Sequence, residues 1–215
     1  MRPKSTRITT ATAILGRYLL ISNANAAILF TSTFDNGTSA QNDGGWNRFS
    51  SYNYASNFTL AGPAGAGPSY AALISDAPMT TMIDLSSEGA DIDAGNVNYD
   101  FSGYLGSYTL NTDRGEFSIQ FKNAVGTNIG AEIVMDDGAA GNPNGTWTQY
   151  TSSGTLAAGV RQVEITFDES RTATFGGTVD GYADLVSFST TVVPEPSSSA
   201  LLGLGGLALI IRRRK

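Results

Sequence analysis

The sequence RQVEITF, at residues 161–167, gives the clearest indication of the fold. Its apolar side chains stand at every second position with polar ones between them, which is the pattern of a β-strand buried on one face. EFSIQF at residues 116–121 and DLVSF at residues 184–188 repeat the pattern. Because one amphipathic strand cannot bury its apolar face alone, these stretches predict sheets packed around a common core.

Four more segments favour strands, and together with the three stretches above they predict about eight strands. They are residues 28–34, 96–102, 128–135 and 145–152, with Gly-, Pro- and Asn-rich punctuation at 62–68 and 138–145. One helical turn is expected at residues 86–93, with Ser86 or Ser87 as its N-cap. This spacing predicts an all-β fold, a single β-sandwich of the jelly-roll type.

The composition excludes several kinds of chemistry. The chain contains neither cysteine nor histidine. Without cysteine there is no disulfide, no thiolate metal site and no thiol nucleophile. Without histidine there is no Ser-His-Asp triad, no HExxH zinc site and no imidazole acid or base. We therefore expect no catalytic residues and a domain that binds its ligand without turning it over.

Charge is segregated along the chain. Eight of the 13 basic residues lie in the first 17 or the last four positions. The domain at residues 27–191 keeps five basic and 18 acidic residues, a net charge of −13. Such a surface repels nucleic acid, and it suits an extracellular protein that binds cations or neutral sugars.

Residues 1–26 have the order of a secretory signal peptide. A basic start precedes an apolar stretch at residues 8–21, which Arg17 interrupts, and the small-x-small sequence Ala24-Asn25-Ala26 follows. We expect export, with signal peptidase as a processing partner and a mature chain that begins near Ala27.

The last 24 residues, 192–215, read VVPEPSSSALLGLGGLALIIRRRK. Pro194-Glu195-Pro196 fixes an extended, accessible peptide. The apolar segment 200–211 is short for a transmembrane helix, and the basic end 212–215 favours the cytoplasmic side. This arrangement resembles the PEP-CTERM sorting signal. The resemblance implies an exosortase partner, transient anchoring in the inner membrane, and delivery to the cell surface or the extracellular space.

The domain between these ends, residues 27–191, resembles a family of secreted bacterial jelly-roll domains related in fold to galactose-binding-like domains and carbohydrate-binding modules. The resemblance covers about residues 80–190 and is clearest in GYADLVSF at 181–188. A tryptophan often found in that family is replaced by Tyr104 in this chain. The resemblance implies a binding function and no shared catalytic set.

Galactose-binding-like sandwiches often hold one structural calcium near the junction of the first and last strands. On this chain the resemblance implies Asp35, Asp184 and the nearby Asp180 as ligands, with Asn36 and backbone carbonyls completing the six to eight oxygens that calcium needs. The alternative is that Asp180 and Asp184 are turn residues that bind their own backbone. DIDAGN at residues 91–96 resembles the start of a calcium loop but lacks the EF-hand glycine and glutamate, so a helix end is expected there.

Aromatic side chains outside the apolar stripes can stack on the C–H faces of sugar rings. We expect ligand contacts at Trp46 and Arg48 in a polar loop, and at Tyr104 and Trp147. The wider set of aromatic candidates also includes Tyr52, Tyr54, Tyr70 and Tyr150.

Three functions remain open from the sequence. The first is an exported surface or matrix protein whose sandwich binds polysaccharide without catalysis. The second is a secreted glycoside hydrolase that uses carboxylates, for which Glu132 and Asp136 are four residues apart on one strand face. The third is a purely structural or adhesive domain.

Overall fold

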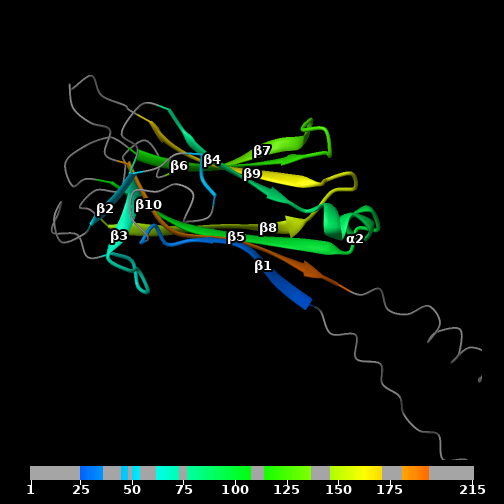
Figure 1. Cartoon of the computed structure of the whole chain (residues 1–215), viewed down its shortest axis with the longest axis horizontal. Coiled ribbons are helices and arrows are strands. Elements are labelled where there is room, and N and C mark those ends of the chain that lie inside the picture. Colours follow the sequence, from blue (N-terminus) through cyan, green and yellow to red (C-terminus); the bar gives the residue numbers. More distant parts are fainter. Residues whose placement is uncertain are drawn as a thin grey trace, which may run out of the picture.

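The computed structural model describes residues 25–35, 45–47, 50–53, 62–72, 77–107, 114–136, 146–170 and 181–193. Two β-sheets lie face to face as two layers (Figure 1). The predicted sorting segment beyond Val193 and the signal peptide, apart from its last two positions, lie outside the described residues. No helix among the described residues is long and apolar enough to cross a membrane.

The larger sheet, sheet A, has the strand order β2-β3-β10-β5-β8, and β1 also pairs with β10. Its strands are β1 (Asn25–Ser32), β2 (Ser50–Asn53), β3 (Ser69–Ala72), β5 (Val97–Ser107), β8 (Trp147–Thr155) and β10 (Gly181–Val192). The second sheet, sheet B, has the order β4-β9-β6-β7. Its strands are β4 (Met79–Asp84), β6 (Arg114–Lys122), β7 (Asn128–Asp136) and β9 (Gln162–Ser170).

This strand order is that of a jelly roll. With the two four-residue strands β2 and β3 set aside, the sheets read β1-β10-β5-β8 and β4-β9-β6-β7. These eight antiparallel strands form the two interlocked Greek keys that define the fold. The predicted all-β jelly-roll sandwich is therefore confirmed.

The core lies where the alternating stretches of the sequence face one another. The inward side chains of QVEITF, now in β9, are fully buried together with Phe117 and Ile119 of β6, and Phe121 is partly buried. Phe117 of β6 packs edge-on against Phe101 of β5, with ring centroids 5.4 Å apart, and joins the two layers. Gly103 makes this contact possible, because a Cβ at that position would lie 2.7 Å from the Phe117 ring.

The predicted helical turn is present as a 3-10 turn, η2 (Ser86–Glu88), followed by the short helix α2 (Gly89–Asp93). The expected Ser86 or Ser87 N-cap is wrong, because Leu85 occupies the N-cap of η2 and no side chain caps it. The amide of Ser86 instead donates to Asp84 Oδ1 at 2.9 Å. The side chain that orders this corner therefore belongs to the preceding strand.

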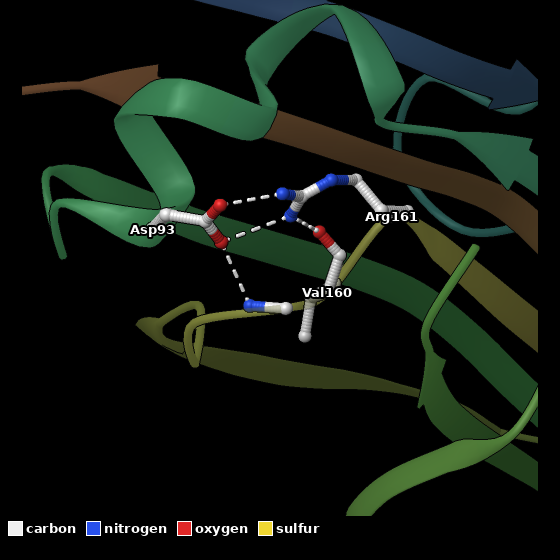
Figure 2. A network of polar contacts seen from close by, with 4 residues as sticks. Asp93, Val160 and Arg161 are labelled. Atoms are coloured by element: carbon white, nitrogen blue, oxygen red, sulfur yellow. Dashed lines mark hydrogen bonds and ion pairs between the residues drawn. The ribbon is translucent and has the colours of Figure 1, made fainter.

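A polar network ties α2 to the segment that enters β9 (Figure 2). Arg161 Nη2 lies 2.6 Å from Asp93 Oδ2, and Nη1 donates to Oδ1 at 3.1 Å. The amide of Gly159 also donates to Asp93 Oδ1, at 2.9 Å. The Arg161 hydrogen bond, followed by that of Gly159, holds the pKa of Asp93 below its usual value.

The start of β1 and the end of β10 lie side by side at one end of the sandwich (Figure 1). Asn25 is opposite Val192, and Ala27 is opposite Thr190. The described chain therefore enters and leaves the domain at the same end, which is the end that carries α2.

Candidate functional site

The strand register brings several of the predicted site residues onto the outer face of sheet A. Leu105 of β5 is opposite Ala183 of β10, and both point into the core. Because side chains alternate along a strand, their neighbours Tyr104 and Asp184, which are opposite each other, point outward. Trp147 of β8 is opposite Gly106 and lies on this same face.

Trp147 rests on the backbone of β5. A Cβ at Gly106 would lie 3.0 Å from the indole ring, so any other residue there would require the ring to shift. The ring is flanked by Tyr70 of β3 at 6.0 Å and Tyr182 of β10 at 6.5 Å between centroids. Tyr70 and Tyr182 are in edge-on contact at 4.8 Å.

We call Tyr70, Tyr104, Trp147 and Tyr182 the aromatic surface. Tyr70 and Tyr182 are each only 3% exposed and form its base, whereas Trp147 and Tyr104 are half-buried and reachable from solvent. Gln149, which is opposite Tyr104 on β8, is exposed beside them. The outer face of sheet A therefore carries two partly exposed aromatic residues beside a buried aromatic base and an exposed amide.

Small hydroxyl side chains cover much of the rest of this outer face, which also carries the exposed Asp100. Ser102 of β5 and Ser187 of β10 are opposite each other, with their Oγ atoms 2.9 Å apart. Thr155 of β8 donates to Asn98 Oδ1 at 2.8 Å. Beyond the aromatic surface, the face therefore presents hydroxyl and amide groups in rows across the strands.

Trp46 and Arg48 are the other two residues for which the sequence predicts ligand contact. Trp46 is 2% exposed and belongs to the core, where its ring packs against Phe30 at 5.6 Å and Phe34 at 6.0 Å. Its indole N–H donates to Ser32 Oγ at 3.0 Å. This packing leaves Trp46 no open ring face, so the structure does not present it to a ligand. Arg48 lies outside the described residues.

Asp35 and Asp184 lie where β1 and β3 meet along one edge of β10. β1 pairs with β10 from Val186 onward, and β3 pairs with Tyr182 and Ala183, so Asp184 falls between them. Asp184 is fully buried at a bulge, and its Oδ1 accepts the amide of Leu185 at 2.7 Å. Asp35 Oδ1 accepts the amide of Ser69 at the start of β3, at 3.1 Å.

The hydrogen bonds of Asp35 and Asp184 can be compared with the two expectations from the sequence, calcium ligands or turn residues. Both carboxylates already bind backbone amides, as the turn-residue alternative expects. Among the described residues, no three acidic side chains form a group that could hold a metal ion. Asp180 and Asn36, the other predicted ligands, lie outside those residues. A calcium ion at this junction stays a prediction.

Glu132 and Asp136, the carboxylates considered for hydrolysis, are exposed on β7 of sheet B. Their neighbours Ile133 and Met135 pack against the core, so the two acids face away from it. The core of the sandwich therefore separates them from the aromatic surface on sheet A. A sugar held at the aromatic surface lies out of their reach.

Tyr182 is the member of the aromatic surface that sequence reasoning missed. GYADLVSF reads as one buried strand, and Tyr182 is indeed buried, but it lies outside the main core cluster. The alternation of Tyr182 and Asp184 around the inward Ala183 is the signal that marks the outer face.

Residues 192–215 match the PEP-CTERM protein-sorting motif, so the predicted recognition of this segment is confirmed. The molecule is thus a jelly-roll sandwich followed by a sorting motif of exported, surface-sorted proteins. No curated protein matches the chain.

Several solved structures are similar to this chain. The enzymatically active domain of bacteriophage CBA120 tailspike protein 4 is 15% identical over 66% of this chain and 17% of that one, with a TM-score of 0.43. The CBM22-1–GH10 modules of Clostridium thermocellum xylanase 10B with xylohexaose are 14% identical over 75% of this chain and 28% of that one, with a TM-score of 0.46. The CBM22-1 xylan-binding domain of Paenibacillus barcinonensis Xyn10C is 12% identical over 80% and 99% of the two chains, with a TM-score of 0.43.

The matched part of this chain thus corresponds to about a sixth of the tailspike chain and about a quarter of the xylanase chain. The jelly-roll assignment stands on the strand order of the chain itself.

Proposed function

We propose that this chain is an exported surface protein whose sandwich binds polysaccharide at the aromatic surface without hydrolysing it. The observation that carries the proposal is the packing of Trp147 on the outer face of sheet A. Its ring lies across Gly106 and is supported by Tyr70 and Tyr182, and the residue is partly exposed. A buried aromatic base holds an accessible ring in one orientation, which lowers the entropy cost of stacking a ligand on it.

The chemistry around this ring suits a neutral sugar. Flat aromatic faces match the C–H faces of pyranose rings, and Gln149 and the Ser and Thr side chains of the same face match sugar hydroxyls. A net charge of −13 between the terminal segments disfavours acidic polymers such as nucleic acids. The ligand class that fits best is therefore an uncharged polysaccharide.

The position of the surface supports a role at the cell surface. Tyr182 and Asp184 lie at the start of β10, and the sorting motif follows the end of the same 12-residue strand. A strand of this length extends about 40 Å. We therefore propose that the aromatic surface faces outward while the opposite end faces the membrane. Signal peptidase and an exosortase are the proposed processing partners, and membrane anchoring through the short apolar segment 200–211 is proposed to be transient.

The test is a binding titration of the exported protein against a panel of neutral and acidic polysaccharides. Trp147→Ala is expected to weaken binding about tenfold or more, which corresponds to about 1.4 kcal/mol, and Tyr104→Ala to act in the same direction. The matched control is Trp46→Phe, which removes the hydrogen bond to Ser32 within the core. It is expected to lower stability and leave the affinity of the folded protein unchanged.

The same panel separates the rival functions. Release of sugar that disappears in Glu132→Gln would establish the hydrolase. Absence of binding to every polysaccharide, with folded protein confirmed by circular dichroism, would leave the purely structural domain. Binding that survives Trp147→Ala and Tyr104→Ala would place the ligand on a different face.

A further inference from the structure

We infer that β8 is an interaction edge that pairs with β8 of a second copy of this chain. In the described part of the molecule β8 is the last strand of sheet A, and β5 is its one neighbour. From Gln149 to Thr155 its side chains are exposed or half-buried. A strand edge of this kind presents a row of backbone groups that another strand can bind.

The hydrogen-bond pattern shows which groups of β8 face the open edge. The amide of Leu156 donates to the carbonyl of Val97 at 2.9 Å, and these two residues continue the β5–β8 register. In an antiparallel pair the hydrogen-bonded residues alternate. The even-numbered residues of β8 therefore bond to β5, and the backbone groups of Gln149, Thr151, Ser153 and Thr155 point away from it.

This edge lacks the features that normally prevent strand pairing. Its sequence, WTQYTSSGT, contains no charged residue and no proline, and its register with β5 has no bulge over nine residues. The edge strand of sheet B, β7, is equally long but carries Glu132 and Asp136. It also has Gly130 at a φ of +75° and a register shift against β6. β7 is thus protected against edge pairing and β8 is not.

A second copy is the partner that fits. In a molecule with so many acids, two β8 edges can meet without placing like charges opposite each other. Pairing about a two-fold axis at Thr151, the middle of the strand, places Gln149 opposite Ser153. Cross-strand contacts between hydroxyl and amide side chains are favourable, so the strand is complementary to itself.

This pairing has a geometric consequence. β8 and β10 are both antiparallel to β5 and therefore run in the same direction. A two-fold antiparallel β8 pair reverses one copy relative to the other, so the two β10 ends point in opposite directions. Such a pair joins copies on two facing surfaces, or copies released into the surroundings, rather than neighbours anchored side by side in one membrane. The inference does not depend on the proposed sugar ligand.

The test is the oligomeric state of the exported protein, measured by sedimentation equilibrium over a concentration series. We expect a monomer–dimer equilibrium. Ser153→Pro removes an amide that faces the open edge and spares the β5 ladder, so it is expected to raise the dimer dissociation constant about tenfold or more. Ser153→Lys, which keeps the amide but adds a charge at the edge, should act in the same direction. Val134→Lys on β7 is the matched control and should leave the equilibrium unchanged.

A cysteine substitution tests the partner strand directly. The chain has no cysteine, so a single introduced thiol reports without background. Thr151→Cys should give a disulfide-linked dimer under mild oxidation, because facing residues of paired strands lie within disulfide distance. Val134→Cys should stay monomeric. A protein that is monomeric throughout the series, or a dimer that persists in both Ser153 variants, would overturn the inference.

Discussion

At the scale of single residues, Asp93 shows how a polar side chain anchors a short helix at a corner of the sandwich. α2 has only five residues and no side-chain N-cap, so neither length nor capping stabilises it. Asp93 compensates by binding both Arg161 and the Gly159 amide (Figure 2). The segment DIDAGN therefore ends a helix, as expected, and its second aspartate binds the protein rather than a metal.

The network predicts a pH-dependent contribution to stability. The pKa of Asp93 in the folded protein is lowered from its ordinary value of 3.8. A carboxylate whose pKa falls on folding stabilises the native state above its unfolded pKa, and this contribution is lost as pH falls through the folded pKa. Asp93→Asn is therefore expected to lower the melting temperature at pH 7. The difference from the unmodified protein should shrink as the pH falls below about 4.

Melting curves from pH 7 to pH 3 measure this difference. The matched control is Asp91→Asn, a substitution of an exposed carboxylate on the same helix. The melting temperature of Asp91→Asn should change with pH in the same way as that of the unmodified protein. A difference between Asp93→Asn and the unmodified protein that stays constant over the whole range would show that the charge of Asp93 does not matter.

At the scale of elements, the sequence predicts best those strands whose two faces differ. β6 and β9 alternate strictly and are predictable, whereas β4 is not. In β4 the buried Thr81 and the half-exposed Met82 reverse the usual assignment of polar and apolar side chains. β3 has only four residues, all buried, and therefore shows no alternation. Short strands covered on both faces have no periodic signal.

The sequence predicts which residue types form the candidate site, but it does not predict which of them lie together on one surface. Tyr104 and Trp147 are candidates because of their aromatic rings, and they meet because β5 and β8 pair in one register across 43 residues of sequence. Trp46 is a candidate on the same grounds and is buried. Composition therefore identifies aromatic candidates, and only strand pairing decides which of them face solvent.

The junction of β1, β3 and β10 is where we propose that calcium binds. A divalent cation would relieve the repulsion between Asp35 and Asp184, and the strong acidity of the domain favours it. An ion that binds only the folded state stabilises by about 2.7 kcal/mol at a hundredfold excess over Kd. For a domain of this size we expect the melting temperature to rise on the order of 5–10 °C with calcium, and far less with magnesium.

Asp184→Asn tests the proposed ion and keeps an oxygen that can accept the Leu185 amide. It should abolish the difference between the two cations. Asp100→Asn, an exposed substitution on β5 of the same sheet, is the control and should leave that difference unchanged. Equal shifts with calcium and magnesium would indicate charge screening alone, and Asp184 would then serve only to hold the bulge.

At the scale of the whole molecule, the two ends of the described chain set the orientation of the sandwich. Asn25 and Val192 are paired neighbours, so segments on either side of the domain start from one end of the sandwich. The aromatic surface lies at the other end of β10, and it includes the first residues of β8, whose edge runs along the side. This arrangement separates the proposed membrane contact from the proposed contacts with a polysaccharide and with a second copy.

The sorting motif follows the last strand of the sandwich closely in sequence, because β10 ends at Val192 and Pro194 comes two residues later. A processing enzyme that recognises the motif therefore acts within a few residues of β10, and Glu195 between two prolines is the one acidic residue of the motif. Glu195→Ala is expected to leave an uncleaved precursor that stays in the membrane fraction and ends at Lys215. Mass spectrometry of surface and membrane protein measures this, with Ser199→Ala as a control that leaves the motif intact and should be processed normally. Unmodified surface protein that still ends at Lys215 would contradict cleavage at the motif.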